Sequence, residues 1–178
     1  MNKELNTKEI CKQIKSSGNN GCIIWSRETN QHFVSNRHFL IRFDELPKDV
    51  LVSLFSIFFK LPEVGQTLQS VYGEVDEKGT PLNVASIYKP EQQSIEGEVT
   101  KYLKEFDEKL LLRVIKFPGH ESYINEKYMK MTKDKNPKVE KNIATVPVYF
   151  ANGDLILLPV RDTSKEDKKI VDMLRNRK

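Results

Sequence analysis

The feature that most constrains the fold is a hairpin near the end of the sequence, between Ala144 and Arg161. It reads ATVPVYFANGDLILLPVR, and apolar residues flank the pair Asn152-Gly153. Asn-Gly favours a type I′ turn because both residues accept a positive φ, and this turn joins two antiparallel strands. Pro159 cannot donate a hydrogen bond to a neighbouring strand, so it marks a strand end, an edge or a bulge. The hairpin therefore predicts an antiparallel sheet.

The rest of the chain alternates between helical and strand-like patterns. Asn6 can cap a helix that stops at Gly18. The segment 48–60 is apolar on nearly every side, which is typical of a helix that is buried or covered by a partner. Apolar residues at helical spacing predict an amphipathic helix over 94–107. Further helices are expected over 123–132 and 165–177, and strands over 21–26, 32–43, 67–75, 81–88 and 109–117.

This order of elements predicts an α+β fold in which helices cover antiparallel sheets. The strand-strand-helix order recurs, which suggests that one domain, 1–178, consists of two related modules, 1–90 and 91–178.

Composition excludes several classes of protein. The 178 residues are 38% hydrophobic and 30% charged, which is typical of a soluble globular domain. No apolar run approaches the length of about 18 residues that crosses a membrane, and no signal peptide follows the first lysine. We therefore expect a cytoplasmic protein with no membrane partner. Cys11 and Cys22 lack the spacing of metal ligands, and we expect two free thiols.

Basic residues concentrate in the last third of the chain. Residues 125–178 include 13 basic and 8 acidic residues, whereas residues 61–124 include 7 and 11. We therefore expect an anionic partner, DNA or a nucleoprotein complex, to bind here through phosphate contacts that are independent of base sequence. The alternative is a lysine-rich surface that contacts only solvent. The candidate nucleic-acid-binding residues are Lys127, Lys130, Lys133, Lys135, Lys138 and Lys141.

Three segments resemble the domains of bacterial DNA polymerase sliding clamps. The strand LILLPVR is similar to the apolar-Pro-apolar-Arg strand that closes such a domain. The segment VSNRHFLIRF (34–43) resembles a strand-turn-strand with the core Thr-Asp-Gly-His-Arg-Leu, but Arg37 replaces the glycine and Phe39 replaces the arginine. The segment YINEKYMKM (123–131) is similar to a family helix that opens with Asn and continues with Tyr.

The resemblance implies a non-enzymatic protein whose lysine- and arginine-bearing helices surround duplex DNA. It also implies an apolar groove beside the closing strand that binds short peptides of partner proteins. Clamp chains contain three such domains, whereas this chain could hold one, or one and part of another. Its size suggests an accessory protein of a phage or mobile element and leaves a homo-oligomer open. The groove residues would be Leu157, Leu158, Pro159, Val160 and Arg161. The alternative is that these residues belong to the core.

The sequence indicates no catalytic centre, metal site or cofactor. His32 and His38 share one hairpin without an accompanying cluster of Cys, Asp or Glu, and His120 lacks a second group for acid-base catalysis. We therefore expect a binding protein rather than an enzyme. Two other functions stay open: an inhibitor of a host defence nuclease, of the anti-CRISPR type, and a small nuclease.

Overall fold

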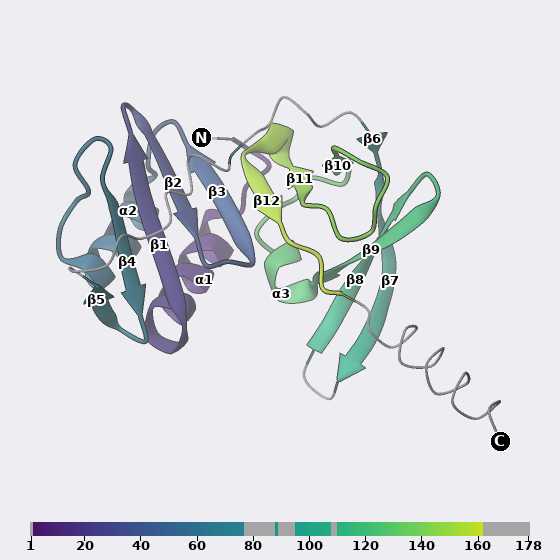
Figure 1. Cartoon of the computed structure of the whole chain (residues 1–178), viewed down its shortest axis with the longest axis horizontal. Coiled ribbons are helices and arrows are strands. Elements are labelled where there is room, and N and C mark those ends of the chain that lie inside the picture. The colour runs from purple at the N-terminus through teal and green to yellow at the C-terminus, as the bar shows by residue number, and fades with distance from the viewer. Residues whose placement is uncertain (1, 77–87, 89–94, 108–109, 162–178) are drawn as a thin grey trace, which may run out of the picture.

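A long antiparallel sheet forms the centre of the computed structural model, which describes residues 2–76, 88, 95–107 and 110–161. The sheet has nine strands in the order β5-β4-β1-β2-β3-β12-β11-β10-β6, and a separate sheet has the order β7-β8-β9 (Figure 1). The first half of the chain contributes β1 (Cys22–Glu28), β2 (Gln31–Ser35), β3 (Phe39–Phe43), β4 (Thr67–Val71) and β5 (Glu74–Asp76). The second half contributes β6 (Ile95–Glu96), β7 (Glu98–Asp107), β8 (Leu110–Phe117), β9 (His120–Asn125), β10 (Lys138–Val139), β11 (Val148–Phe150) and β12 (Leu155–Leu157).

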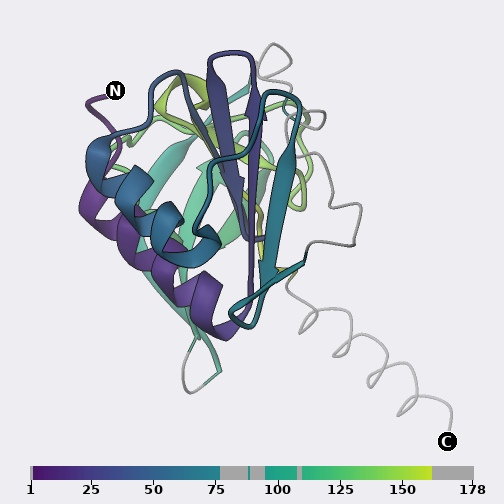
Figure 2. The same ribbon diagram turned by 90° about the vertical axis from the view of Figure 1, so that its left-hand side faces the viewer.

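Two helices, α1 (Thr7–Asn20) and α2 (Lys48–Phe58), lie side by side over one face of the long sheet (Figure 2). Asn6 caps α1 as expected, because its side chain accepts a hydrogen bond from the backbone N–H of Glu9. Gly18 does not end α1. A Cβ atom there would lie 2.5 Å from Cδ1 of Ile57, so the absence of a side chain lets the two helices approach closely.

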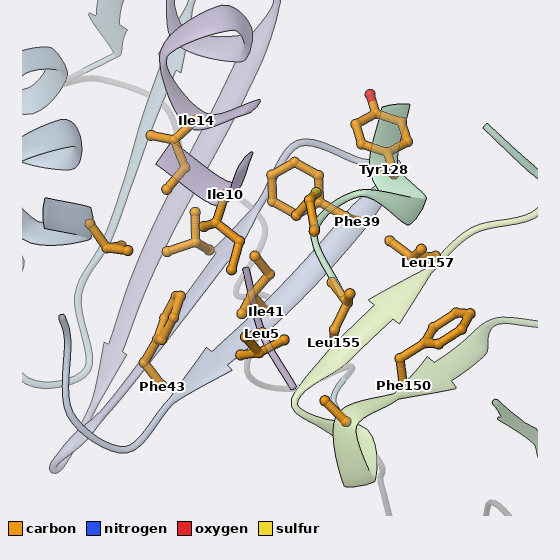
Figure 3. Close-up of a cluster of buried hydrophobic side chains, with 14 of the residues drawn as sticks. Leu5, Ile10, Ile14, Phe39, Ile41, Phe43, Tyr128, Phe150, Leu155 and Leu157 are labelled. Atoms are coloured by element: carbon orange, nitrogen blue, oxygen red, sulfur yellow. The ribbon is translucent and has the colours of Figure 1, made fainter. Parts of the chain in front are cut away.

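The main hydrophobic core joins the two halves of the chain. β12 pairs with β3, and Leu155 lies opposite Ile41 in the register. Leu5 and Ile10 from the N-terminal segment pack against these strands (Figure 3). The fold is therefore α+β with antiparallel sheets, as predicted, and α1 and α2 cover one face of the long sheet. The division into modules 1–90 and 91–178 stays a prediction.

The helix expected over 94–107 is wrong, because Ile95–Glu96 form β6 and Glu98–Asp107 form β7. β7 pairs with β8 over its length, and the register shifts between Val99 and Leu103. At this bulge the Thr100 hydroxyl donates to the carbonyl of Val114 at 2.8 Å. Apolar side chains on a strand with a bulge no longer alternate strictly, so their spacing imitates that of a helix.

Other boundaries also differ from the sequence-based expectations. Residues 32–43 and 67–75 each form two strands with a tight turn, and most of 123–132 is the end of β9 followed by the short helix α3 (Glu126–Met129). The closing hairpin is present, but Phe150 pairs with Leu155, so four residues rather than a two-residue type I′ turn connect its strands. The strand expected over 81–88, apart from position 88, and the helix expected over 165–177 lie outside the described residues. Within the described part of the chain, no helix has the length and apolar character needed to cross a membrane.

Helix α2 is not buried on all sides. Val50, Leu54 and Phe58 point into the core, whereas Val52 and Phe55 are exposed. The sequence alone could not separate these two faces, because both are apolar.

Candidate nucleic-acid interface

A cleft lined by lysines lies between β7, β8 and the segment that follows α3. It encloses about 400 Å³, and Lys101, Lys130 and Lys135 lie around it. All three lysines are exposed. We call this feature the lysine cleft. Its volume is within the range of about 300–1,000 Å³ that is usual for ligand pockets.

An ion pair neutralises the carboxylate of the lysine cleft. Arg113 Nε donates to Glu126 Oε2 at 2.9 Å, and Arg113 Nη2 donates to Glu126 Oε1 at 2.6 Å. This hydrogen bond to Glu126 raises the pKa of Arg113, although burial opposes the shift. Among the described residues that line the cleft, Glu126 is the sole acidic one. The charge of the three lysines is therefore not balanced within the cleft.

A buried aspartate fixes the segment that presents Lys135. Asp134 Oδ1 accepts from the backbone N–H of Asn136 at 2.8 Å, and Asp134 Oδ2 accepts from the backbone N–H of Ala151 at 2.7 Å. The backbone N–H of Val99 on β7 also donates to the carbonyl of Lys135 at 3.3 Å. Lys135 thus sits on a segment that is tied both to the closing hairpin and to β7.

The six lysines expected to bind nucleic acid are not equivalent. Lys130 and Lys135 line the cleft, and Lys133 is exposed on the same segment. The remaining three contact other side chains. Lys127 Nζ lies 4.7 Å from the centre of the Tyr128 ring, Lys138 Nζ lies 3.4 Å from a carboxylate oxygen of Glu96, and Lys141 Nζ lies 3.9 Å from one of Glu140.

Lys101 was not among the residues expected from the sequence. It belongs to the middle third of the chain, where acidic residues outnumber basic ones. It reaches the cleft because β7 is hydrogen-bonded to the segment after α3, where the N–H of Val99 donates to the carbonyl of Lys135. No local pattern around Lys101 distinguishes it from a solvent-exposed lysine.

The residues expected to form a partner groove lie in different environments. Leu157 is fully buried in the main core, whereas Leu158 is 43% exposed. Pro159 and Val160 are half-buried, and Arg161 is exposed. After Leu157 the chain leaves the sheet: Leu158 N–H donates to the carbonyl of His38, and Val160 N–H donates to that of Tyr123. Leu158 and Arg161 are therefore the members of this set that a partner can reach most easily.

A second cavity, of about 430 Å³, has the opposite charge character. Arg42 is its basic residue, and it donates to Asp154 Oδ1 from Nη2 at 2.7 Å and from Nε at 3.0 Å. Asp44 and Glu45 also line this cavity. An anion would therefore prefer the lysine cleft.

The histidines have structural neighbours rather than a shared site. His32 Nδ1 accepts a hydrogen bond from Trp25 Nε1 at 3.1 Å, and burial together with the charge of Arg27 lowers the pKa of His32. The ring of His38 stacks on that of Tyr128. Within the described ranges, no group of three or more His, Cys, Asp or Glu side chains could hold a metal ion.

Comparison of the chain with protein-family models, curated proteins and solved structures finds no match.

Proposed function

We propose that the protein is a non-enzymatic DNA-binding protein that holds the phosphate backbone in the lysine cleft. The observation that carries this proposal is the convergence of Lys101, Lys130 and Lys135 on a cleft whose carboxylate is already paired with Arg113. Lysine side chains that neutralise phosphates release condensed counterions, and this release drives binding that is independent of sequence. The fixed position of the segment around Asp134 supports a site that exists before DNA arrives.

The relation to sliding clamps is part of this proposal. Its local support is the turn between β2 and β3, where Arg37 replaces the glycine of the family and has φ 71°. Glycine adopts this left-handed conformation without strain, so the turn has the geometry for which the family residue is suited. The helix layer gives less support to a clamp-like mode of DNA binding, in which basic helices face the duplex. α1 exposes Lys8, Lys12 and Lys15, but α2 exposes apolar side chains.

Salt-dependent DNA binding tests the proposal directly. We would measure the affinity for labelled duplex and single-stranded DNA by fluorescence anisotropy over a range of salt concentrations. The triple variant Lys101→Gln, Lys130→Gln, Lys135→Gln removes three cleft charges. If each lysine contacts a phosphate, the slope of log K against log salt should fall by about 2.7 for duplex and by about 2.1 for single strands.

The matched control removes the same charge from α1, through Lys8→Gln, Lys12→Gln and Lys15→Gln. It should leave the slope nearly unchanged. In the reverse result, the slope of log K against log salt would fall in the α1 variant and stay unchanged in the cleft variant. This result would show that the helix layer contacts the DNA, as in a clamp. Absence of binding to both forms of DNA at low salt would reject the proposal and favour the inhibitor of a defence nuclease.

A further inference from the structure

The outer face of α2 and the segment that follows it form an unusual apolar surface. Val52, Phe55 and Phe59 recur at intervals of three and four residues, which places them on one face of the helix. They are 57%, 46% and 75% exposed. Leu61 and Val64 are also exposed just beyond the helix. We call these five residues the α2 apolar face.

Phe59 is exposed and conformationally strained at the same time. It caps α2 with φ 54°, and its backbone N–H donates to the carbonyl of Phe55 at 2.9 Å. Helices commonly end with such a left-handed residue, but it is usually glycine, because a side chain at positive φ costs free energy. A bulky aromatic residue here gains little from the monomer, since most of its surface contacts solvent. A partner that covers the ring would remove this apolar surface from water, and that burial would also offset the free-energy cost of the left-handed conformation.

The α2 apolar face is comparable in size to the largest apolar patch of an ordinary monomer, and such patches are often functional. A fully covered aromatic side chain buries about 150–250 Å², so these partly exposed residues together present on the order of 500 Å². The largest apolar patch on a typical monomer is about 300–600 Å² and is often functional. A standard interface buries about 800 Å² on each partner, so a polar rim must supply the remainder.

The charges around this face suit a second copy of the same surface. Lys48 and Asp49 lie at the start of α2, Lys60 and Glu63 lie just past its end, and all four are exposed. If two α2 helices pack antiparallel about a two-fold axis near Phe55, the start of each helix lies toward the end of the other. Asp49 of each copy then lies toward Lys60 of the other, and Lys48 lies toward Glu63. The same operation brings Val52 of each copy toward Phe59 of the other. Such an interface is self-complementary, which is the requirement for a two-fold dimer.

We propose that the α2 apolar face is the interface of a homodimer, formed by antiparallel packing of α2 against α2 of a second copy. The proposal does not depend on DNA binding, because the lysine cleft is lined by residues of β7, β8, α3 and the segment after α3, and these elements lie far from α2 (Figure 1). The interface closes at two copies, so no larger assembly is expected.

Sedimentation equilibrium of the full chain tests this inference, and Phe59→Gly is the most informative variant. It removes the largest side chain of the face and also relieves the left-handed strain. The dimer dissociation constant should rise at least tenfold, while the melting temperature of the dilute monomer should stay level or rise. A residue that only supports the fold would lower the melting temperature instead.

Two controls separate the effects of this variant. Arg37→Gly relieves the same kind of strain at φ 71° without removing an apolar surface, so it should leave dimerisation unchanged. Leu158→Ala shortens an exposed apolar side chain elsewhere and should also leave it unchanged. A wild-type protein that stays monomeric at 100 µM or above, or that forms a ladder of higher oligomers, would overturn the proposal. An equal loss of dimer in Phe59→Gly and Leu158→Ala would overturn it as well.

Discussion

The buried carboxylate of Asp134 allows a sharp test of how the lysine cleft is built. Each of its oxygens accepts one backbone hydrogen bond, at 2.8 Å from Asn136 and at 2.7 Å from Ala151. The residue is 8% exposed, so water cannot readily replace either partner. Asp134→Asn keeps the shape of the side chain but turns one acceptor into an NH₂ donor. Whichever way the amide turns, one backbone N–H loses its acceptor.

The expected loss of stability follows from these contacts. A hydrogen bond to a charged group contributes about 1.5–3 kcal/mol, and a buried donor left without a partner costs about 1–3 kcal/mol. Asp134→Asn should therefore lower the free energy of unfolding by about 2–4 kcal/mol, which is a large share of the total of about 5–15 kcal/mol for a domain. Asp134→Ala removes both acceptors and should lower it further.

Urea denaturation measures this loss, and the single tryptophan, Trp25, is a suitable fluorescent probe because it is fully buried. Hydrogen exchange at the Ala151 amide reports the broken contact itself. Asp44→Asn is the matched control, because the Asp44 side chain is 70% exposed. If Asp134→Asn lost less than about 0.5 kcal/mol, which is typical of a surface substitution, and the Ala151 amide stayed protected, the anchoring role of Asp134 would be refuted.

Two further predictions concern stability. Phe58→Ala should cost about 3–5 kcal/mol, because the ring is 3% exposed and its centre lies 5.8 Å from that of Trp25, whereas Phe55→Ala on the outer face should cost less than about 1 kcal/mol. Equal losses in urea would contradict the assignment of the two faces. Burial and Arg27 lower the pKa of His32 in the folded state, so its contribution to stability is complete above about pH 6.5 and falls as pH decreases below that value. His32→Asn, whose Oδ1 can accept the Trp25 hydrogen bond, should flatten the dependence of the urea midpoint on pH between about 5 and 7, and an unchanged profile would exclude His32 as its source.

Local chemistry was enough to predict the class of the fold. The cap at Asn6, the apolar run of β8 and the closing hairpin each act over a few residues, and all three appear where the sequence places them. The helix expected over 94–107 failed because its hydrophobic spacing arises from a bulge, and a bulge depends on the partner strand. A non-local pairing of this kind leaves no trace in the spacing of one segment.

The candidate site shows the same limit. Charge counted along the chain pointed to Lys130 and Lys135, which do line the cleft. It could not point to Lys101, since the surrounding sequence is acidic and the contribution of this lysine depends on how β7 packs. It also could not show that Glu96 pairs with Lys138. Linear charge therefore locates a basic region, whereas the selection of residues within it is a property of the tertiary structure.

The two proposals together constrain how a dimer would bind DNA. A monomer that contacts phosphates through three cleft lysines should show a log–log salt slope of about 2.7 from these residues, and two clefts on one duplex should double this slope. Phe59→Gly leaves the lysine cleft intact and removes only the apolar contact between copies. If the slope halves in this variant, both clefts engage one DNA molecule, and the wild-type affinity includes a gain from bivalency. If the slope is unchanged while the dimer is lost, each cleft binds DNA independently. The α2 interface would then hold the two clefts in positions that one duplex cannot bridge.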